Sequence, residues 1–101
     1  MIKVNIKKDN NIITNIKIDG HAGYGIKGTD IVCASVSSIV ITSINAIIKL
    51  DNEALDYKQD EGFVEVIIKK HSKEVDILIE NMVSLLKELE NQYKKNIKIY
   101  E

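Results

Sequence analysis

Apolar and polar residues alternate at the start of the chain. In residues 2–7 every second residue is Ile or Val, and the residues between them are Lys or Asn. A period of two places alternate side chains on one face of a strand, so this segment predicts a half-buried β-strand. Asp9-Asn10-Asn11 is typical of a turn, and residues 12–19 are expected to form the second strand of a hairpin.

The pattern becomes helical after residue 28. Thr29 or Asp30 is a suitable N-cap, and we expect the helix to run to about Leu50. Many of its residues are β-branched, but its polar residues recur every three or four positions, which favours a helix. They form one narrow stripe of Ser35, Ser38, Thr42, Asn45 and Lys49. The rest is nearly all apolar, so we expect this helix to be largely buried, with the stripe facing solvent or a second copy of the protein.

The second half of the chain repeats the order of strand pair and helix. Residues 52–59 predict a weaker strand, residues 60–62 a turn, and residues 63–69 a strong strand. Ser72 is expected to cap a second helix, and a final strand contains Ile97 and Ile99. The apolar face of that helix consists of Val75, Leu78, Ile79, Met82, Leu85, Leu86, Leu89 and Tyr93. The order ββαββαβ predicts an α+β fold, a mainly antiparallel sheet packed with two helices, in one domain of residues 1–101.

Composition excludes several classes of protein. The formal net charge is −1, and the chain has fourteen lysines but no arginine, so we expect no direct nucleic-acid partner. A single cysteine cannot form an internal disulfide, which fits a reducing cytoplasm. The first residues lack the continuous apolar run of a signal peptide, and polar residues interrupt the stretch 31–50. We therefore expect a soluble cytoplasmic protein without a membrane span.

The segment between the first hairpin and the first helix is rich in glycine. Residues 21–33 read HAGYGIKGTDIVC, in which residues 23–28 spell G-x-G-x-x-G. A dinucleotide site would need this motif inside a βαβ unit of a parallel sheet, whereas an antiparallel hairpin precedes it here. The spacing also does not fit a P-loop. We interpret Gly23, Gly25 and Gly28, together with Gly20, as the source of a flexible loop.

Two reactive side chains flank this loop. Counted from a cap at Thr29 or Asp30, Cys33 lies in the first helical turn, where backbone N–H groups and the helix dipole favour a thiolate. The alternative for Cys33 is a small buried hydrophobic residue, and the alternative for His21 is a surface loop histidine. If the glycines let His21 approach Cys33, the two form the minimum set for an activated nucleophile. His71, which lies among lysines, is expected in a solvated charge cluster, and we expect no metal site.

The residues around this cysteine resemble those of a known protease family. Residues 20–37 read GHAGYGIKGTDIVCASVS, and residues 43–50 of the same helix read SINAIIKL. This sequence closely resembles the ribosomal-processing cysteine protease family called Prp, over essentially the whole chain in length and element order. The resemblance implies a cysteine endopeptidase that removes an N-terminal extension from one large-subunit ribosomal protein, of the L27 type. It places the catalytic pair on His21 and Cys33, gives supporting roles to Gly20, Asp30 and Ser37, and points to a homodimer.

The expected reaction is acyl transfer without a metal or organic cofactor. His21 draws the proton from Cys33, whose sulfur attacks a backbone carbonyl of the precursor ribosomal protein. Whether Asp30 orients His21 or caps the helix stays open, as does whether Ser37 bonds near the sulfur or to its own helix backbone. The alternatives are a ribosome-assembly factor that binds the same ribosomal protein without cutting it, and a thioesterase or acyltransferase that uses the same pair. We also predict that the glycine loop closes only on substrate.

Overall fold

In the part of the chain that the structure describes, the fold consists of five strands and two helices in the predicted order. The computed structural model describes residues 1–20 and 29–101, apart from the side chains of residues 29 and 30. The elements are β1 (Ile2–Asp9), β2 (Ile12–Asp19), α1 (Thr29–Leu50), β3 (Leu55–Asp60), β4 (Phe63–Ile68), α2 (Lys73–Gln92) and β5 (Ile97–Tyr100). β3 begins three residues later than predicted, because a turn occupies residues 51–54. In that turn the Asp51 carboxylate accepts from the Glu53 N–H (2.9 Å) and the Asp51 carbonyl accepts from the Ala54 N–H (3.1 Å).

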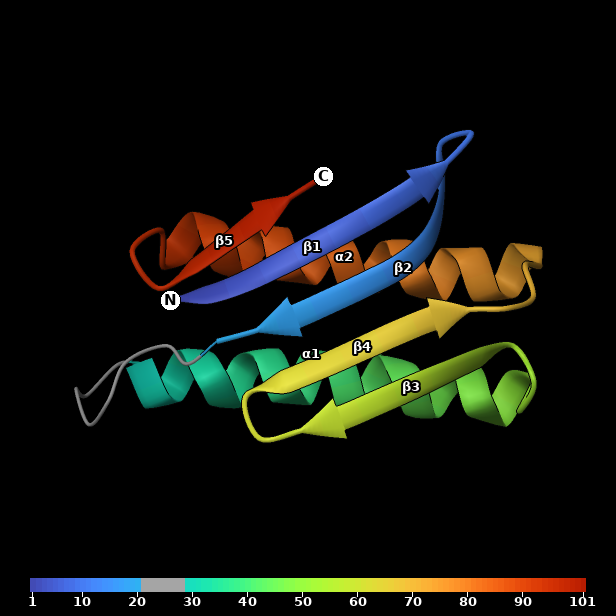
Figure 1. Cartoon of the computed structure of the whole chain (residues 1–101), viewed down its shortest axis with the longest axis horizontal. Helices are drawn as coiled ribbons and strands as arrows, with labels where there is room; N and C mark the ends of the chain where they lie inside the picture. Colours follow the sequence, from blue (N-terminus) through green and yellow to red (C-terminus); the bar gives the residue numbers. More distant parts are fainter. Residues whose placement is uncertain (21–28) are drawn as a thin grey trace.

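The strands form one sheet in the order β3-β4-β2-β1-β5. Only β1 and β5 run parallel; the other neighbours are antiparallel. Both helices lie on the same face of this sheet (Figure 1), so the molecule has two layers. The predicted fold, a mainly antiparallel sheet packed with two helices, is therefore confirmed.

Two short turns set the registers of the hairpins. In the β1–β2 hairpin Asp9 pairs with Ile12, and the two residues between them, Asn10 and Asn11, have φ values of 54° and 66°. Two consecutive positive φ values are typical of a type I′ turn, for which asparagine is well suited. In the β3–β4 hairpin Asp60 pairs with Phe63, and Gly62 has a φ of 69°. Gly62 and Cys33 line the same cavity, so this second turn contributes to the surroundings of the cysteine.

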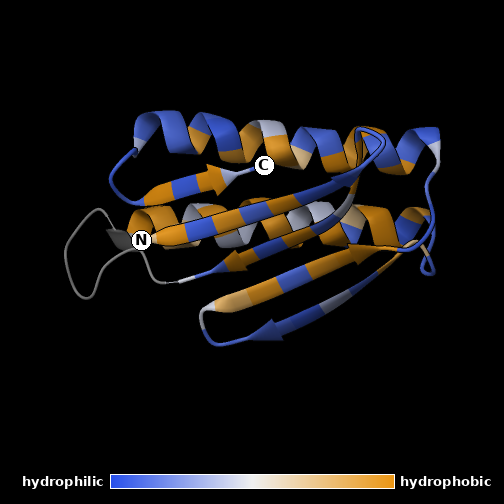
Figure 2. Cartoon of the chain, turned by 45° about the horizontal axis from the view of Figure 1, so that its top comes forward, coloured by the Kyte–Doolittle hydropathy of each residue, from blue (hydrophilic) through white to orange (hydrophobic). Residues whose placement is uncertain are grey.

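The core lies between the sheet and the helices. Along β1 the residues predicted to face inward are buried and their neighbours are more exposed. The alternating colours of this strand in Figure 2 show the matching alternation of hydrophobic and hydrophilic residues. The largest fully buried side chains come from both layers: Ile16, Ile47, Met82, Leu86, Ile97, Val4, Val32 and Val66. The core is thus one continuous cluster that fixes both helices on the sheet.

Helix α1 is less buried than its composition predicts. Its buried stripe is Val32, Val36, Val40, Ser43, Ile44 and Ile47. Ile31, Ile41 and Leu50 are exposed by 58%, 47% and 55%, because a two-layer domain covers a helix from one side only. Residues 31–50 are long and apolar enough to cross a membrane by length and composition. The core helix of a two-layer domain meets the same criterion, and the buried stripe packs α1 into the core.

Helix α2 follows its prediction closely. The Val75 N–H donates to the Ser72 hydroxyl oxygen at 3.1 Å, so Ser72 is the N-cap. The buried residues of the helix are Val75, Ile79, Met82, Val83, Leu86 and Leu89. Leu85, predicted on the apolar face, is 37% exposed. It lies at the border of that face.

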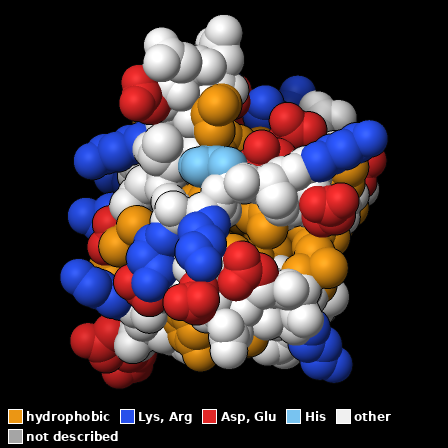
Figure 3. All heavy atoms as spheres, turned by 90° about the vertical axis from the view of Figure 1, so that its right-hand side faces the viewer, with side chains coloured by type: hydrophobic (Ala, Val, Ile, Leu, Met, Phe, Trp, Pro, Cys, Tyr) orange, Lys and Arg blue, Asp and Glu red, His pale blue; other side chains and the backbone are white. Residues whose placement is uncertain are grey.

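The end of the molecule where α2 begins carries side chains of both charges (Figure 3). His71 belongs to this surface, as predicted, and its Nδ1 lies 2.9 Å from an Asp76 carboxylate oxygen. Two lysine–carboxylate pairs lie beside it, Lys69 with Asp56 (3.4 Å) and Lys70 with Glu53 (3.3 Å). In each of these pairs the carboxylate balances the positive charge of its lysine.

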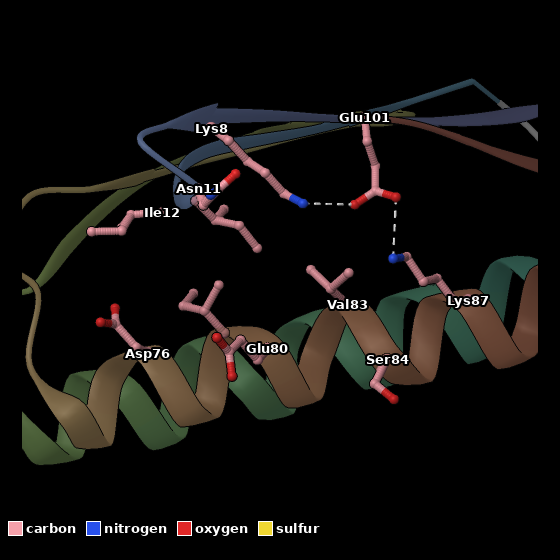
Figure 4. Close-up of a pocket in the computed structure, with 11 residues that line it drawn as sticks. Lys8, Asn11, Ile12, Asp76, Glu80, Val83, Ser84, Lys87 and Glu101 are labelled. Atoms are coloured by element: carbon pink, nitrogen blue, oxygen red, sulfur yellow. Dashed lines mark ion pairs between the residues drawn. The ribbon is translucent and has the colours of Figure 1, made fainter.

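A cavity of about 350 Å³ lies between the β1–β2 hairpin and α2 (Figure 4). At one side of it the Glu101 carboxylate bridges Lys8 and Lys87, each at 3.1 Å. The hydrogen bond from Lys8, followed by that from Lys87, lowers the pKa of Glu101 below its usual value. Within residues 1–20 and 29–101, no group of three histidine, cysteine or acidic side chains could hold a metal ion.

Candidate active site

Cys33 lies near the start of α1, at the end of the molecule away from His71. It is the fifth residue of the helix, and its side chain is partly buried against the core. The helix begins at Thr29, so the predicted cap residues 29 and 30 both lie inside its first turn. Cys33 therefore opens the second turn and is not one of the four residues whose N–H groups lack an intrahelical partner. Those N–H groups lie one turn away from it.

Cys33 opens onto a cavity of about 230 Å³ between α1 and the sheet. One wall is a stripe of α1 whose residues recur every three or four positions, which puts them on one side of the helix. That stripe is Cys33, Val36, Ser37, Val40 and Ile41. The opposite wall combines the start of β1, the end of β2 and the β3–β4 hairpin. It contains Ile2, Ile18, Gly20, Gln59, Asp60, Gly62, Phe63 and Val64.

The chemistry of this cavity is mostly apolar. Among the lining residues that the structure describes, polar or charged side chains are limited to Ser37, Gln59 and Asp60. The Asp60 carboxylate accepts a hydrogen bond of 2.7 Å from the Glu61 N–H, so the turn itself orients it. A cavity of this kind suits an apolar side chain of a bound peptide and places that side chain beside a sulfur atom.

Gly20 joins the walls of the cavity at the point where the chain leaves β2. Its N–H donates to the Gly62 carbonyl at 3.0 Å, and its φ is +101°. A Cβ atom at this position would clash with the Met1 carbonyl oxygen and lie 3.3 Å from the Met1 carbonyl carbon. Because L-residues with a side chain rarely adopt this φ, glycine is required here on two grounds.

The structure brings together three residues predicted for the site. Gly20, Cys33 and Ser37 line the same cavity although Gly20 and Cys33 are 13 positions apart in the sequence. The backbone of Asp30 lies in the first turn of α1. His21, Gly23, Gly25 and Gly28 lie outside the described residues, and so does the loop predicted to close on substrate. The catalytic and supporting roles stay predictions.

Ser37 lies one turn after Cys33 on the same stripe of α1 and is exposed. The structure gives its hydroxyl no hydrogen bond to another described residue. Ser43, by contrast, donates to the Ile39 carbonyl four residues earlier, at 2.7 Å. The bond of Ser37 to its own helix backbone, one of the two predicted alternatives, is therefore absent from the described part of the chain.

The hairpin residues of the cavity were missed by sequence reasoning. Gln59, Asp60, Gly62, Phe63 and Val64 were predicted only as parts of two strands and a turn. They lie about 30 residues from Cys33 in sequence, and none belongs to a motif that indicates binding. No signal in the sequence connects this hairpin with the site, because the strand order β3-β4-β2 that brings it there depends on long-range pairing.

Comparison with known proteins agrees with the geometry. Residues 1–98 match the model of a family described as Cysteine protease Prp. The ribosomal processing cysteine protease Prp of Staphylococcus aureus is 34% identical over 103 residues, which cover 98% of this chain and 97% of that protein.

Two crystal structures of Prp from S. aureus have closely similar folds. One is in complex with a substrate peptide and is 33% identical, with a TM-score of 0.89 over 99% of this chain and 98% of that one. The other carries a covalently linked product peptide and is 34% identical, with a TM-score of 0.87 over 98% of this chain and 97% of that one. With a half-buried cysteine beside an apolar cavity and a match over nearly its whole length, the chain belongs to the Prp family of ribosomal processing cysteine proteases.

Proposed function

We propose that this protease removes the N-terminal extension of a precursor large-subunit ribosomal protein of the L27 type, in the cytoplasm. The observation that carries the proposal is that Cys33 lines a cavity whose walls come from α1 and from strands that are distant in the sequence. The covalently linked product peptide in the S. aureus relative supports a peptide substrate and a covalent step. A single cysteine fits a cytoplasmic enzyme, because a reducing compartment keeps a thiol reduced.

The reaction follows from a cysteine nucleophile and a nearby base. His21 removes the proton of Cys33, and the sulfur attacks the carbonyl carbon of the scissile bond. The C–N bond then breaks as His21 returns its proton to the leaving amine, which leaves a thioester between Cys33 and the N-terminal fragment. Water hydrolyses the thioester and restores the thiol. His21 follows Gly20 directly, and Gly20 lines the cavity, so the chain leaves β2 beside Cys33.

The oxyanion formed in the attack needs hydrogen-bond donors. The first residues of α1 have backbone N–H groups without intrahelical acceptors, and the helix dipole is positive there. They lie one helical turn before Cys33 in α1. We propose that these N–H groups donate hydrogen bonds to the carbonyl oxygen of the scissile bond, because such donors stabilise a charge that develops in the transition state.

The experiment is cleavage of the host's own precursor ribosomal protein, followed by intact-mass measurement. We expect one mass loss that corresponds to removal of an N-terminal segment, and none from the mature form. His21→Ala should abolish this loss. His71→Ala is the matched control, because its side chain pairs with Asp76 at the other end of the molecule. An intact precursor after long incubation with the unaltered protein would contradict the proposed substrate.

We also propose that the protein is a homodimer. The outer side of the helix layer exposes Ile31 and Leu85 on either side of a shallow groove between α1 and α2, whose floor includes Ala34, Ser35 and Ser38. Small residues let a partner helix approach closely, and the exposed apolar area favours its burial. Light scattering should give twice the chain mass of 11.4 kDa, and Leu85→Lys should weaken the dimer. A monomer at micromolar concentration would exclude this assembly.

A further inference from the structure

Gln59, near the end of β3, is one of the residues that line the Cys33 cavity. In the sheet it pairs with Val64, and Val64 pairs with Ile18, so these three residues form a row across β3, β4 and β2. The row faces the helices, because Ile18 is buried in the core and because Leu55, four residues before Gln59 on β3, is buried too. All three residues line the cavity. Gln59 thus ends an apolar row with a polar side chain.

No protein group in the described part of the chain satisfies the Gln59 amide, which is exposed and forms no hydrogen bond there. It is the only side-chain amide among the lining residues. A primary amide offers two N–H donors and one carbonyl acceptor, so it can pair with both the carbonyl and the N–H of one peptide group. The charged residue of the lining, Asp60, follows Gln59 on β3, and its carboxylate already accepts a hydrogen bond from the Glu61 N–H.

The surroundings of Gln59 leave room for an extended peptide. β3 is the edge strand of the sheet, so it has no strand neighbour on its outer side. Proteins commonly bind extended segments at such places, with backbone hydrogen bonds for affinity and pockets for the side chains. A substrate whose apolar side chain fills the cavity would bring its own backbone close to Gln59, which is an exposed residue of the lining.

We infer that Gln59 is a substrate-positioning residue that pairs with one backbone peptide group of the substrate, beside the residue whose side chain fills the cavity. The inference rests on the proposed function. Gln59 recognises the backbone, so it favours an extended substrate without selecting its sequence, while the apolar walls select the side chain. Because this pairing forms on binding and persists through the reaction, it affects KM and leaves kcat nearly unchanged.

The test is steady-state cleavage of a synthetic peptide that covers the junction of the host's precursor. Gln59→Ala should raise KM roughly fivefold to thirtyfold, as expected for the loss of one or two hydrogen bonds, with kcat nearly unchanged. Lys58→Ala is the matched control. It changes the preceding residue of β3, which pairs with Glu65 on the opposite face of the sheet, and should leave both constants unchanged. Equal melting temperatures would show that neither change alters the fold.

A second series identifies the bonded peptide group. Single backbone N-methylations along the peptide remove one N–H each, and one position should weaken binding to the unaltered protein but add nothing in Gln59→Ala. The role of Gln59 would be overturned if the KM of Gln59→Ala equalled that of the unaltered protein. It would also be overturned if the effects of Gln59→Ala and of N-methylation on binding were purely additive at every position. Either result would leave the proposed function standing. If the unaltered protein cleaves no peptide, the proposed function fails. The same comparison by fluorescence anisotropy in a Cys33→Ala background then decides the role of Gln59.

Discussion

Replacement of Gly20 by alanine is the sharpest structural perturbation that the site offers. The side chain would be forced to adopt a φ of +101° and to overlap the Met1 carbonyl oxygen. A backbone conformation of this kind costs about 1–3 kcal/mol in a residue with a Cβ. Relief by movement would break the hydrogen bond between the Gly20 N–H and the Gly62 carbonyl, worth about 1 kcal/mol net. We expect Gly20→Ala to lower the free energy of unfolding by about 2–4 kcal/mol.

For a domain of this size such a loss lowers the melting temperature by roughly 8–30 °C. Denaturant unfolding with an unchanged m value would measure the free energy directly. Gly62→Asn is the control: Gly62 has a φ of 69°, a conformation that asparagine tolerates, so its cost should stay below about 1 kcal/mol. At a temperature where both variants are folded, Gly20→Ala should lose most of its kcat/KM, because residue 21 follows directly. If Gly20→Ala were no less stable than Gly62→Asn, the reasoning about Gly20 would be wrong.

Three further predictions concern separate parts of the molecule. Ser72→Ala removes the N-cap of α2 and should lower the free energy of unfolding, measured by thermal unfolding, by about 1 kcal/mol. Ser84→Ala, at an exposed residue of α2, should be nearly neutral, and equal losses in the two variants would argue against the cap. Iodoacetamide should alkylate Cys33 in the folded protein near neutral pH, and a reaction that needs denaturant would show that the sulfur is inaccessible. Because Lys8 and Lys87 lower the pKa of Glu101, its ion pairs stabilise the fold above the usual pKa of 4.5 and are lost as pH falls below it. The stability difference between the unaltered protein and Glu101→Gln should therefore be small at pH 7 and shrink as the pH falls through the lowered pKa of Glu101, and a difference that grows on acidification would contradict this.

The order and type of the elements could be predicted from the sequence because each follows from a local period. Alternation in residues 2–7 and the cap at Ser72 act within a few residues, and both were confirmed. Element boundaries depend on less regular contacts. The turn at Asp51 delays β3, and α1 begins at Thr29, which moves Cys33 from the first turn to the second. That shift changes the expected surroundings of the sulfur, because the unpaired N–H groups lie one turn before the cysteine and do not include its own.

The candidate site could be predicted only in part. Cys33 and Ser37 lie one helical turn apart, so their common side of α1 follows from the sequence alone. Their neighbours Gln59 and Phe63 come from a hairpin whose contact with α1 is set by the strand order β3-β4-β2. No local pattern encodes that order. Likewise, the sequence of α1 predicts that most of the helix surface is apolar. How much of that surface stays exposed depends on the two-layer arrangement, in which the sheet covers one side of the helix only.

The central claim is that Cys33 becomes covalently attached to the substrate during peptide cleavage. The direct test is rapid mixing of the protein with a junction peptide, acid quenching, and measurement of the intact protein mass. We predict a transient increase equal to the N-terminal product fragment minus one water, located at Cys33 by fragmentation and absent from Cys33→Ala, which should cleave nothing. Cleavage of the peptide by Cys33→Ala at the normal rate would contradict the account.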